Sequence, residues 1–520
     1  MKINNVTIVG GGTSGWMTAA AFCRVLPEIK VTLIESPTVK TVQVGESTLQ
    51  QFNQYLNLIG LEDKDWMKDC DATYKVSIKF TNFREIDSEF HYPFGRHNAE
   101  HMSRGLDTWP IIRQLNPQYN SLDKFSCFYN PLVNLALTNK MTDNDDNIIP
   151  NFFFDQDTAY HLDATKFGIY LKNNICVPSG VNYIESDVID IVKKTNGDID
   201  YLVLKNSEKI SSDLYIDCTG FKSLLLEEQM ESKFISFNET LLNDKALAAK
   251  VSYKNINEEL ENFTNCTAIE NGWVWNIPLW SRIGTGYCYS SKFASREQAE
   301  KEFRNYLQSI GKTLPDDYEF NEINIRHGKR EKAWVGNVIG VGLSYAFIEP
   351  LESTGLLSTH DNIYKLIRVL QRRNGWVSGL DKSIFNKYLD NIIDATRSFV
   401  EMHYALSMRN DTDYWNHVTN IEYDNDYDVS QLEVNALRYS NFNGLQGGMP
   451  YIAAGMGYLP SYKFGSGIPG TGTISPEETE ALDSMGREFM TFTDSLRAFC
   501  RDLPSSYEFL KERIYDQNNR

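Results

Sequence analysis

The chain has 520 residues, of which 42% are hydrophobic and 23% charged, and this composition is typical of a folded globular protein with two or more modules. Its formal net charge of −18 argues against nucleic acid or an anionic membrane as a partner, because both require a basic face. Its eight cysteines include no C-x-x-C pair, so we expect neither a disulfide framework nor a metal site.

The first predicted elements form a βαβ unit. Residues 3–9 are typical of a buried strand, residues 16–23 of a helix, and residues 30–35 of a second strand. This order predicts a doubly wound α/β module at the N-terminus. Residues 213–220 and 335–342 are apolar segments that end in glycine, and we expect them to be further core strands of the same module, with other structure inserted between.

The glycines between the first strand and the first helix fit a dinucleotide-binding fingerprint. Gly10, Gly12 and Gly15 satisfy G-x-G-x-x-G, which lets the backbone approach a pyrophosphate at the start of a helix. Glu35 ends the second strand 20 residues beyond Gly15, where a carboxylate accepts a hydrogen bond from a ribose hydroxyl. This motif alone does not distinguish FAD from NAD.

Residues 73–80 alternate as a strand does. One face carries the four apolar or aromatic side chains, and the other carries Lys75, Ser77 and Lys79. Read by pattern alone, this is a strand with one solvated face. The histidines that follow, His91, His97 and His101, are interpreted as surface or loop residues.

Two tryptophans mark the middle of the chain. In the run from Gly272 to Pro278, Trp273 and Trp275 are two residues apart, so in an extended segment both point to one face. Pro278 ends the run. By composition this is a packed strand with a crowded aromatic face.

A helix start is predicted near residue 353. Pro350 ends the incoming segment, and Ser353, Thr354 and Gly355 open the helix. The free amides of a helix N-terminus favour an anion, although the same pattern also suits a plain capped helix. From about residue 361 the chain reads as mainly helical, and Ser475 to Glu478 form a capping box before the last long helix.

These motifs together resemble the flavin-dependent halogenases, and most closely the branch that acts on free tryptophan or indole. Residues 273–278 match the signature W-x-W-x-I-P, and residues 347–355 match F-x-x-P-x-x-S-x-G at every fixed position. Residues 42–47 resemble G-V-G-E-[AS]-T, and residues 213–220 resemble the I-D-C-[ST]-G strand. Lys75 stands at the first lysine of [FY]-K-x-x-[IV]-[KR]-F, the catalytic one in tryptophan halogenases.

The resemblance implies an α/β fold with two modules. Residues 1–100 and 155–360 would form a Rossmann-like FAD-binding module, similar to glutathione reductase and the hydroxylases, with an interleaved β-sheet. Residues 101–154 and 361–520 would form a mainly helical substrate module. The expected FAD-binding residues are Gly10, Gly12, Thr13, Ser14, Gly15, Glu35, Val44, Gly45, Glu46, Ser47, Gly342, Leu343, Leu351 and Ser353.

The resemblance also implies a mechanism. Reduced FAD and oxygen would oxidise a halide, held by the backbone amides of Thr354 and Gly355, to hypohalous acid. Water exclusion matters because a hydrated halide is a poor nucleophile. Lys75 would deliver the halogen, either as a cation that hydrogen-bonds hypohalous acid or as a neutral amine that is itself halogenated. Glu352 would orient the oxidant or act as the general base, and Trp273 and Trp275 would wall the flavin side.

Departures from the tryptophan-specific pattern bear on the substrate. The paired tyrosines that grip the amino acid are replaced by Met449 and Pro450, and the H-x-F-G element becomes Tyr92-Pro93-Phe94-Gly95. A substrate site built from Tyr92, Phe94, Met449 and Pro450 should hold free tryptophan poorly. We therefore predict a small indole-like or phenolic substrate that stacks on Phe94.

Two alternative functions follow from the same motifs: a flavin-dependent monooxygenase, and a flavin-binding module without turnover. Because no second G-x-G-x-x-G is present, the electrons should come from a separate NAD(P)H-dependent flavin reductase. The chain shows no signal peptide and no apolar run of membrane-spanning length, so we expect a cytoplasmic protein with no membrane contact. A homodimer is compatible with the resemblance. No motif in the sequence indicates the preferred halide or the regiochemistry.

Overall fold

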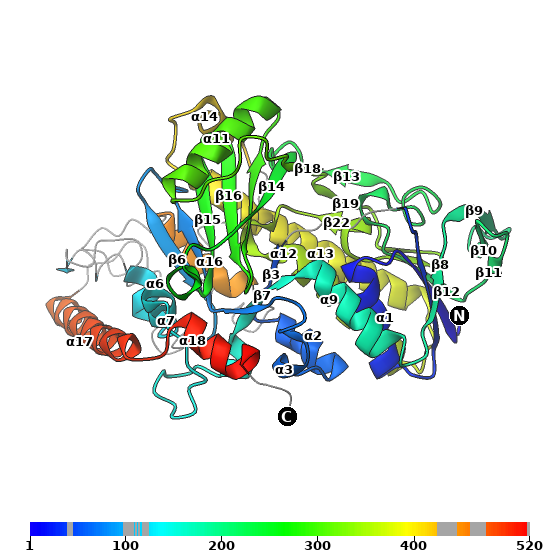
Figure 1. The fold of residues 1–520 in the computed structure, drawn as a ribbon, viewed down its shortest axis with the longest axis horizontal. Coiled ribbons are helices and arrows are strands. Elements are labelled where there is room, and N and C mark those ends of the chain that lie inside the picture. The colour runs from blue at the N-terminus through cyan, green and yellow to red at the C-terminus, as the bar shows by residue number, and fades with distance from the viewer. Residues whose placement is uncertain are drawn as a thin grey trace.

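The computed structural model describes residues 1–38, 45–96, 109, 112, 115–116, 124–423, 445–457 and 475–516. The six-stranded sheet lies toward the end of the molecule that holds the N-terminus, and the seven-stranded sheet rises beside it (Figure 1). Among the described residues, no helix is both long and apolar enough to cross a membrane.

The six-stranded sheet is the predicted doubly wound core. Its order is β20 (Trp334–Val335), β21 (Val338–Gly340), β12 (Leu214–Asp217), β1 (Asn5–Val9), β2 (Lys30–Glu35) and β8 (Asn182–Glu185). All neighbours pair in parallel except the edge strand β20. Helix α1 (Thr13–Val25) follows β1, which confirms the βαβ unit, and β12 confirms the strand predicted within residues 213–220. The segment predicted as one strand over residues 335–342 turns at Gly336 and contributes β21 to the core. Such strands read as apolar runs because helices cover both faces of a parallel sheet.

The seven-stranded sheet carries the tryptophan strand at its centre. Its order is β18 (Asn321–Asn324), β14 (Lys245–Val251), β17 (Ile283–Tyr289), β16 (Gly272–Pro278), β15 (Phe263–Ile269), β5 (Ser77–Thr81) and β6 (Glu89–Pro93). Strand β16 pairs antiparallel with both neighbours, whereas β15 and β5 pair in parallel. The segment around residue 78 therefore joins strands almost 200 residues later in the chain.

The strand predicted over residues 73–80 is divided between two sheets. Strand β4 (Thr73–Lys75) pairs with β7 (Ala159–Asp163), which also pairs with β3 (Gly45–Ser47). At Val76 the backbone amide bonds to the Asn262 carbonyl instead, and the chain then continues as β5 in the larger sheet. The face expected to be solvated is mostly covered: Lys75 and Ser77 are fully buried, and only Lys79 is partly exposed.

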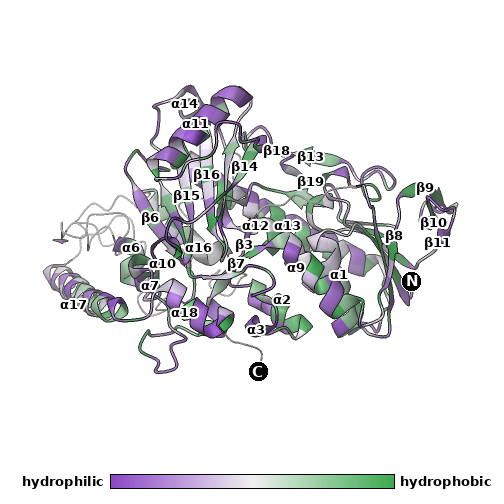
Figure 2. Ribbon diagram, viewed as in Figure 1, coloured by the Kyte–Doolittle hydropathy of each residue, from purple (hydrophilic) through white to green (hydrophobic). Residues whose placement is uncertain are grey.

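The named elements from Thr354 onward are all helical. They are α12 (Thr354–Arg372), α13 (Gly379–Ala405), α14 (Asp413–Val418), α16 (Leu445–Gly455), α17 (Pro476–Arg501), α18 (Ser506–Leu510) and a π-helical turn at Lys511–Tyr515. Helix α17 begins with the predicted capping box, in which Ser475 Oγ accepts from the Glu478 amide. Figure 2 shows its hydrophobic and hydrophilic sides. The division into an FAD module and a substrate module stays a prediction.

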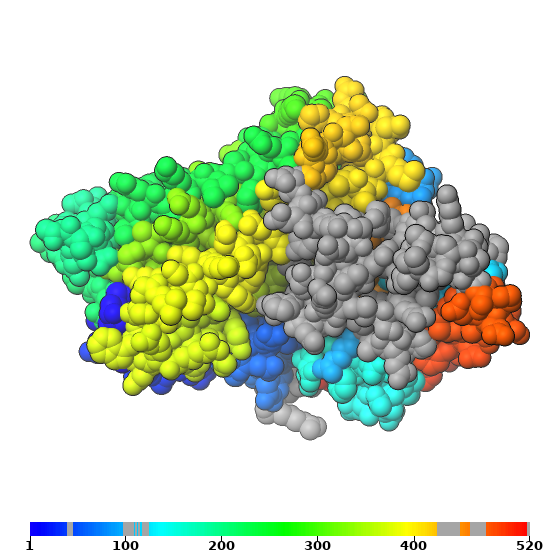
Figure 3. Space-filling model, turned by 180° about the vertical axis from the view of Figure 1, so that it is seen from behind, coloured from blue at the N-terminus to red at the C-terminus, as the bar shows by residue number. Residues whose placement is uncertain are grey.

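Shorter elements connect these layers. The helices are α2 (Phe52–Ile59), α3 (Asp63–Trp66), α6 (Lys124–Tyr129), α7 (Val133–Thr138), α8 (Phe154–Asp157), α9 (Ala164–Tyr170) with a π-helical continuation (Leu171–Cys176), α10 (Ile256–Glu259) and α11 (Arg296–Ser309). The remaining strands are β9 (Val188–Lys193), β10 (Ile199–Leu204), β11 (Lys209–Ile210), β13 (Phe234–Ser236), β19 (Gly328–Arg330) and β22 (Ala346–Phe347). From behind, residues of α12 and α13 form a broad surface beside the N-terminal residues (Figure 3).

Candidate functional site

The glycine edge, defined here as Gly10, Gly12, Gly15 and Gly342, is shaped by close backbone contacts. Gly10 has φ +116°, and a methyl group built on it would lie 2.2 Å from the Cys218 carbonyl oxygen. A methyl group on Gly15 would lie 1.9 Å from the Gly10 carbonyl oxygen. By contrast, a methyl group on Gly12 meets no atom within 4 Å, so open space lies in front of the start of α1. This cradle fits a pyrophosphate, as the fingerprint predicts.

Glu35 lies beside this edge at the end of β2. A methyl group built on Gly11 would lie 2.3 Å from Glu35 Cδ, so the carboxylate sits against the glycine loop. Lys172 donates to Glu35 Oε2 at 3.3 Å. Thr13 is held by a hydrogen bond to the Ala164 carbonyl at 2.9 Å.

The later core strands complete the edge. Gly342, with φ +64°, begins a 3-10 turn (Gly342–Ser344) that contains Leu343, and a methyl group on Gly342 would lie 3.1 Å from Ser14 Cβ. Sequence reasoning missed Asp217, the last residue of β12. Its Oδ2 accepts the amides of Leu225 and Leu226 at 2.7 and 2.8 Å, which fixes the loop after the strand. The acid of the I-D-C-[ST]-G pattern was the signal for it.

The predicted helix start near residue 353 is confirmed. Residues Pro350–Glu352 form a 3-10 turn that includes the buried Leu351, and Ser353 adopts a left-handed conformation with φ +58° before α12 begins at Thr354. The Ser353 side chain does not cap the helix. Thr354 Oγ1 is buried without a hydrogen-bond partner among the described residues. These free donors make the start of α12 suited to an anion.

Glu46 faces the same helix start from β3. Its Oε2 would lie 3.3 Å from a methyl group on Gly355, so no larger side chain fits easily there. Burial raises the pKa of Glu46 to about 7. Gly45 of the same strand packs against the side chains of Ile277 and Leu279 in and after the tryptophan strand. Val44 lies outside the described residues.

Lys75 is fully buried and donates three hydrogen bonds. Its Nζ donates to Ser47 Oγ at 2.7 Å, to Ser353 Oγ at 2.8 Å and to the Thr48 carbonyl at 3.0 Å. The same nitrogen lies 4.8 Å from the centroid of the Phe94 ring. Burial lowers the pKa of Lys75 to about 7, while Cys266 and Glu352 act to raise it.

Glu352 is paired with a histidine that no motif indicated. Its Oε1 lies 2.7 Å from His403 Nε2, and both side chains are fully buried. The contact is close but poorly directed, and neither Glu352 oxygen has a hydrogen-bond partner among the described residues. Burial raises the pKa of Glu352, against the effects of His403 and Lys75. His403 lies in the last turn of α13 and belongs to no motif, so only tertiary packing reveals it. We call Lys75, Phe94, Glu352 and His403 the lysine site.

The tryptophan strand is tied to the segment before α12. Trp273 Nε1 donates to Glu349 Oε2 at 2.7 Å, and both side chains are fully buried. Tyr404 and Asn243 also donate to the Glu349 carboxylate, each at 2.9 Å. The rings of Trp273 and Trp275 lie 6.1 Å apart, as expected for neighbours on one face. Their role as a flavin-side wall stays a prediction.

The expected substrate residues come together across β6 and α16. A methyl group on Gly448 would lie 2.5 Å from the Tyr92 ring, which places α16 against this strand. Met449 and Pro450 are buried in α16. The residue that sequence reasoning missed is the next one, Tyr451. Its ring stacks on Tyr92 at 6.0 Å, and its hydroxyl has no hydrogen-bond partner among the described residues.

The interpretation of His91 as a surface residue was wrong. Its side chain is 5% exposed, and its Nδ1 lies 3.0 Å from Ser77 Oγ. Burial lowers the pKa of His91 to about 3. It is therefore a packing residue of β6 and not a solvated one. His97 and His101 lie outside the described residues.

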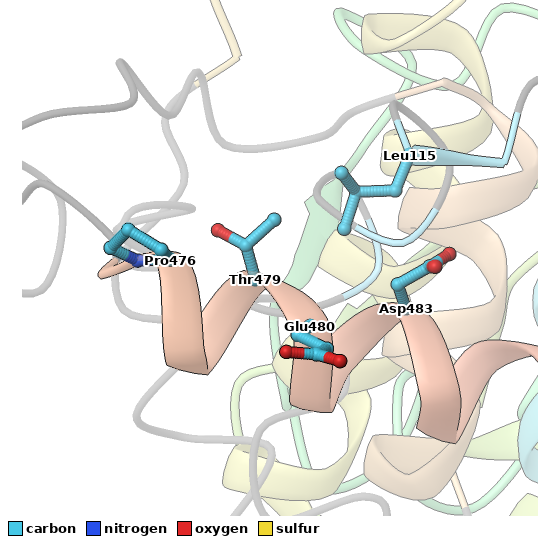
Figure 4. Close-up of a pocket in the computed structure, with 5 residues that line it drawn as sticks. All are labelled: Leu115, Pro476, Thr479, Glu480 and Asp483. Carbon is cyan, nitrogen blue, oxygen red and sulfur yellow. The ribbon is translucent and has the colours of Figure 1, made fainter.

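A separate cavity lies at the first turns of α17. It has a volume of about 430 Å³ and is lined by Leu115, Pro476, Thr479, Glu480 and Asp483 (Figure 4). None of the motif residues reaches it, and Asp483 is already paired with Arg487. We assign it no role in catalysis.

Known proteins match the chain over nearly its whole length. A family model described as tryptophan halogenase matches residues 5–444. The chain belongs to the tryptophan halogenase family. Tryptophan 7-halogenase RebH of Lentzea aerocolonigenes is 30% identical over 546 residues, covering 98% of this chain and 99% of RebH.

Solved structures agree with this membership. The structure of VirX1 has a TM-score of 0.88 at 42% identity and covers 100% of both chains. Tar14, a tryptophan C-6 flavin-dependent halogenase (chlorinase) from taromycin biosynthesis, has a TM-score of 0.82 at 28% identity and covers 98% of this chain and 99% of its own. The chain is therefore an enzyme, a flavin-dependent halogenase, and the two alternative functions are set aside.

Proposed function

We propose that this halogenase transfers an oxidised halogen through Lys75 to a small indole-like or phenolic substrate rather than to free tryptophan. The observation that carries the proposal is the buried Lys75 amine, bonded at once to Ser47 on β3 and to Ser353 at the helix start. A surface lysine would have three hydrated donors instead. Because the amine is desolvated, its contact with an oxidant is not screened by water.

FAD fits the glycine edge. Gly10, Gly12, Thr13, Ser14 and Gly15 would hold its pyrophosphate, Glu35 its ribose, and Gly342 and Leu343 the adjoining part of the cofactor. Reduced FAD with oxygen supplies the oxidising equivalent that converts halide to hypohalous acid. Electrons would come from a separate flavin reductase. Whether the chain works as a homodimer stays a prediction.

The start of α12 would hold the halide. The amides of Thr354 and Gly355 lie in the first turn of α12, where amides have no partner inside the helix. The Ser353 hydroxyl is engaged by Lys75 instead of capping them. Glu46, with a pKa raised to about 7, adds little negative charge there when it is protonated. Trp273 and Trp275 would close the flavin side against the arene. A Trp275→Ala enzyme that keeps the parent's product profile would contradict that role.

Lys75 would deliver the halogen to the substrate ring, and Glu352 would accept the proton that the ring loses. With a pKa of about 7, Lys75 is present as both ammonium and amine near neutral pH, so the two delivery routes remain compatible with its environment. Glu352 Oε1 lies 2.7 Å from His403 Nε2 without a well-directed hydrogen bond, and Oε2 has no close partner among the described residues. That second oxygen is available to accept the proton that the ring loses on halogenation.

The substrate preference rests on which groups face Lys75. The Phe94 ring lies against the amine, so an arene that stacks on this ring is brought beside the lysine. Of the four expected substrate residues, Phe94, Met449 and Pro450 offer no hydrogen-bonding side chain to an amino acid. RebH and Tar14 are named as tryptophan halogenases, so free tryptophan is the substrate to compare.

A single assay tests both parts. The enzyme is supplied with reduced FAD, oxygen, one halide at a time and a panel of indoles, phenols and free tryptophan, and products are identified by mass spectrometry. We expect simple indoles or phenols to be converted at least tenfold faster than tryptophan. Equal rates would contradict the substrate assignment.

Lys75→Ala, run beside the matched variant Lys79→Ala, tests the mechanism. Lys79 is in the same motif but is paired with Glu89 at 2.6 Å and partly exposed. We expect Lys75→Ala to form trappable hypohalous acid without halogenated arene, and Lys79→Ala to keep at least half of the parent rate. Halogenation by Lys75→Ala would refute delivery by this amine.

A further inference from the structure

A chain of buried hydrogen bonds leads away from Lys75 into the protein. Ser47 Oγ, which accepts from Lys75, lies 2.7 Å from Thr264 Oγ1. Thr264 Oγ1 in turn lies 2.9 Å from His161 Nε2. All of these side chains are at least 95% buried, and none belongs to the halide or cofactor motifs except Ser47. The chain joins β3 and β7 of the small sheet to β15 of the large one.

The Thr73 end of this hydrogen-bond chain fixes which atom of each pair is the donor. Thr73 Oγ1 donates to the Pro278 carbonyl at 2.6 Å, and a carbonyl can only accept. The lone pairs of Thr73 Oγ1 are therefore left to accept from His161 Nδ1, 3.1 Å away. His161 carries its proton on Nδ1, and its Nε2 is the acceptor. Burial lowers the pKa of His161 well below its usual value, so the ring stays neutral.

The proton position on His161 then fixes the donor and the acceptor of each hydrogen bond between His161 and Lys75. Thr264 must donate to His161 Nε2, so Ser47 must donate to Thr264. Ser47 Oγ has no hydrogen left for Lys75 and can only accept from it. Ser353 Oγ also donates to Ser47 Oγ at 3.0 Å, which uses the second lone pair of Ser47. Every hydroxyl in the chain then makes the bonds that its one donor and two lone pairs allow.

We propose that His161 is a positioning residue for Lys75, acting through Thr264 and Ser47. It keeps Ser47 as an acceptor of the hydrogen bond from the amine. Of the three groups bonded to the amine, only the Ser353 hydroxyl can then change from acceptor to donor. The Thr48 carbonyl cannot donate, and Ser47 is held by the chain. When Lys75 is neutral, its lone pair must face Ser353. That direction is toward the start of α12, where the halide is proposed to bind. The inference rests on the proposed role of Lys75.

Other charged groups near Lys75 do not replace this control. Glu352 and Cys266 face the amine from the 3-10 turn and from β15, and both act to raise its pKa. The neutral His161 ring contributes through hydrogen bonding alone. Phe94 offers its ring face and no proton. The hydrogen-bond chain from His161 to Ser47 therefore determines the direction in which the lone pair of the Lys75 amine points.

The first test removes one hydroxyl. In Thr264→Val, Ser47 loses its acceptor and can turn to donate to the neutral amine, which favours that form. We expect the inflection of the pH–rate profile for arene halogenation to move to lower pH by about half to one unit, the value of one hydrogen bond. Thr264→Ser should restore the parent profile. Thr267→Val is the matched control, because Thr267 is on the same strand, also buried, and bonded to Asn265 and Tyr306 instead.

Hypohalous acid formation, measured with a diffusible trap in the same samples, separates the possible failures. If profiles of Thr264→Val and the parent superimpose while the arene is still halogenated, the chain has no control over Lys75 and this inference is overturned. If no variant, the parent included, halogenates any arene although the trap is consumed, the proposed function itself fails.

The second test reads the histidine directly and does not depend on activity. The full-length protein is labelled with ¹⁵N-histidine, and the His161 signals are identified by their loss in His161→Asn. We expect Nδ1 to be protonated and Nε2 to be bare from pH 6 to 9. A proton on Nε2 in the parent would reverse every bond in the chain and overturn the inference. Should His161→Asn not fold, the signals that shift in Thr264→Val serve for the assignment.

Discussion

The glycine edge and the lysine site differ in the kind of information that defines them. The glycine edge is a backbone structure: Gly10 and Gly15 are required because any side chain would overlap a carbonyl oxygen. The lysine site is made of side chains from separate elements, with Lys75 on β4, Glu352 before α12 and His403 on α13. Apart from Gly342, the glycine edge comes from one contiguous stretch of sequence, whereas the lysine site exists only after the sheets and helices have packed.

This difference has a consequence for stability. Backbone sites are built from residues that cost little to bury, whereas the lysine site buries a cation, a carboxylic acid and an imidazole together. Such groups persist only where hydrogen bonds compensate them, and Lys75 has a partner for each of its three donors. We therefore expect the lysine site, and not the glycine edge, to lower the stability of the fold.

The largest expected effect separates folding from cofactor binding within the glycine edge. Gly10→Ala forces an overlap at 2.2 Å and an unfavourable φ, and should lower the free energy of unfolding by about 3 kcal/mol or more. Gly12→Ala meets no protein atom, so it should fold with a melting temperature close to that of the parent. Its methyl group would occupy the pyrophosphate space, and flavin fluorescence should show FAD binding weakened by at least 100-fold. A Gly12→Ala protein that binds FAD normally would place the cofactor elsewhere.

The next effect falls on chemistry alone. Glu352→Gln keeps the shape and the contact with His403 but removes the carboxylate that would accept a proton. We expect the halogenation kcat to fall by about 100-fold or more, as for loss of a general base. Hypohalous acid formation should be unchanged, and circular dichroism should show an intact fold. Equal loss of both activities would mean that Glu352 serves oxidant formation instead.

The same contrast explains what could be read from the sequence. The βαβ unit, the fingerprint and the helix start at Thr354 were predictable because spacing and residue type act locally there. The alternation over residues 73–80 was misleading, because the chain leaves one sheet at Val76 and enters another, and Lys75 and Ser77 of the polar face are buried. His403, Tyr451 and His161 carry no local pattern. Their importance depends on partners in other elements, such as Glu352 for His403, Thr264 for His161 and Tyr92 for Tyr451.

A pH-dependent effect on stability measures the cost of the buried lysine. In the unfolded chain Lys75 has its ordinary pKa near 10.5, and in the fold the pKa is about 7. The unfolded state therefore binds more protons between these values, and stability gains with rising pH. The free-energy cost of burying the protonated Lys75 is fully present below about pH 7 and disappears as the pH rises toward 10.5.

Lys75→Met removes this dependence. From pH 7 to 9, the parent should gain stability relative to the variant by about 1.4 kcal/mol per pH unit at most, measured by urea unfolding. Lys79→Met, at a partly exposed position, should run parallel to the parent. Parallel curves for Lys75→Met would show that the buried amine keeps an ordinary pKa.

The smallest effect concerns the surface that receives the arene. Phe94→Leu keeps an apolar side chain beside Lys75 but removes the ring on which the substrate is expected to stack. Because aromatic pairs contribute about 0.5–1.5 kcal/mol beyond burial, KM for an indole should rise roughly 3- to 10-fold while hypohalous acid formation stays constant. The control is Phe90→Leu, in strand β6 just before Phe94, where the ring packs on Phe80 at 5.1 Å instead of on the amine. If both variants raise KM alike, general loosening of β6 accounts for the change. If neither does, the arene binds away from Phe94, and the lysine site must be reached from the side of Tyr92 and Tyr451, whose stacked rings then become the next positions to substitute.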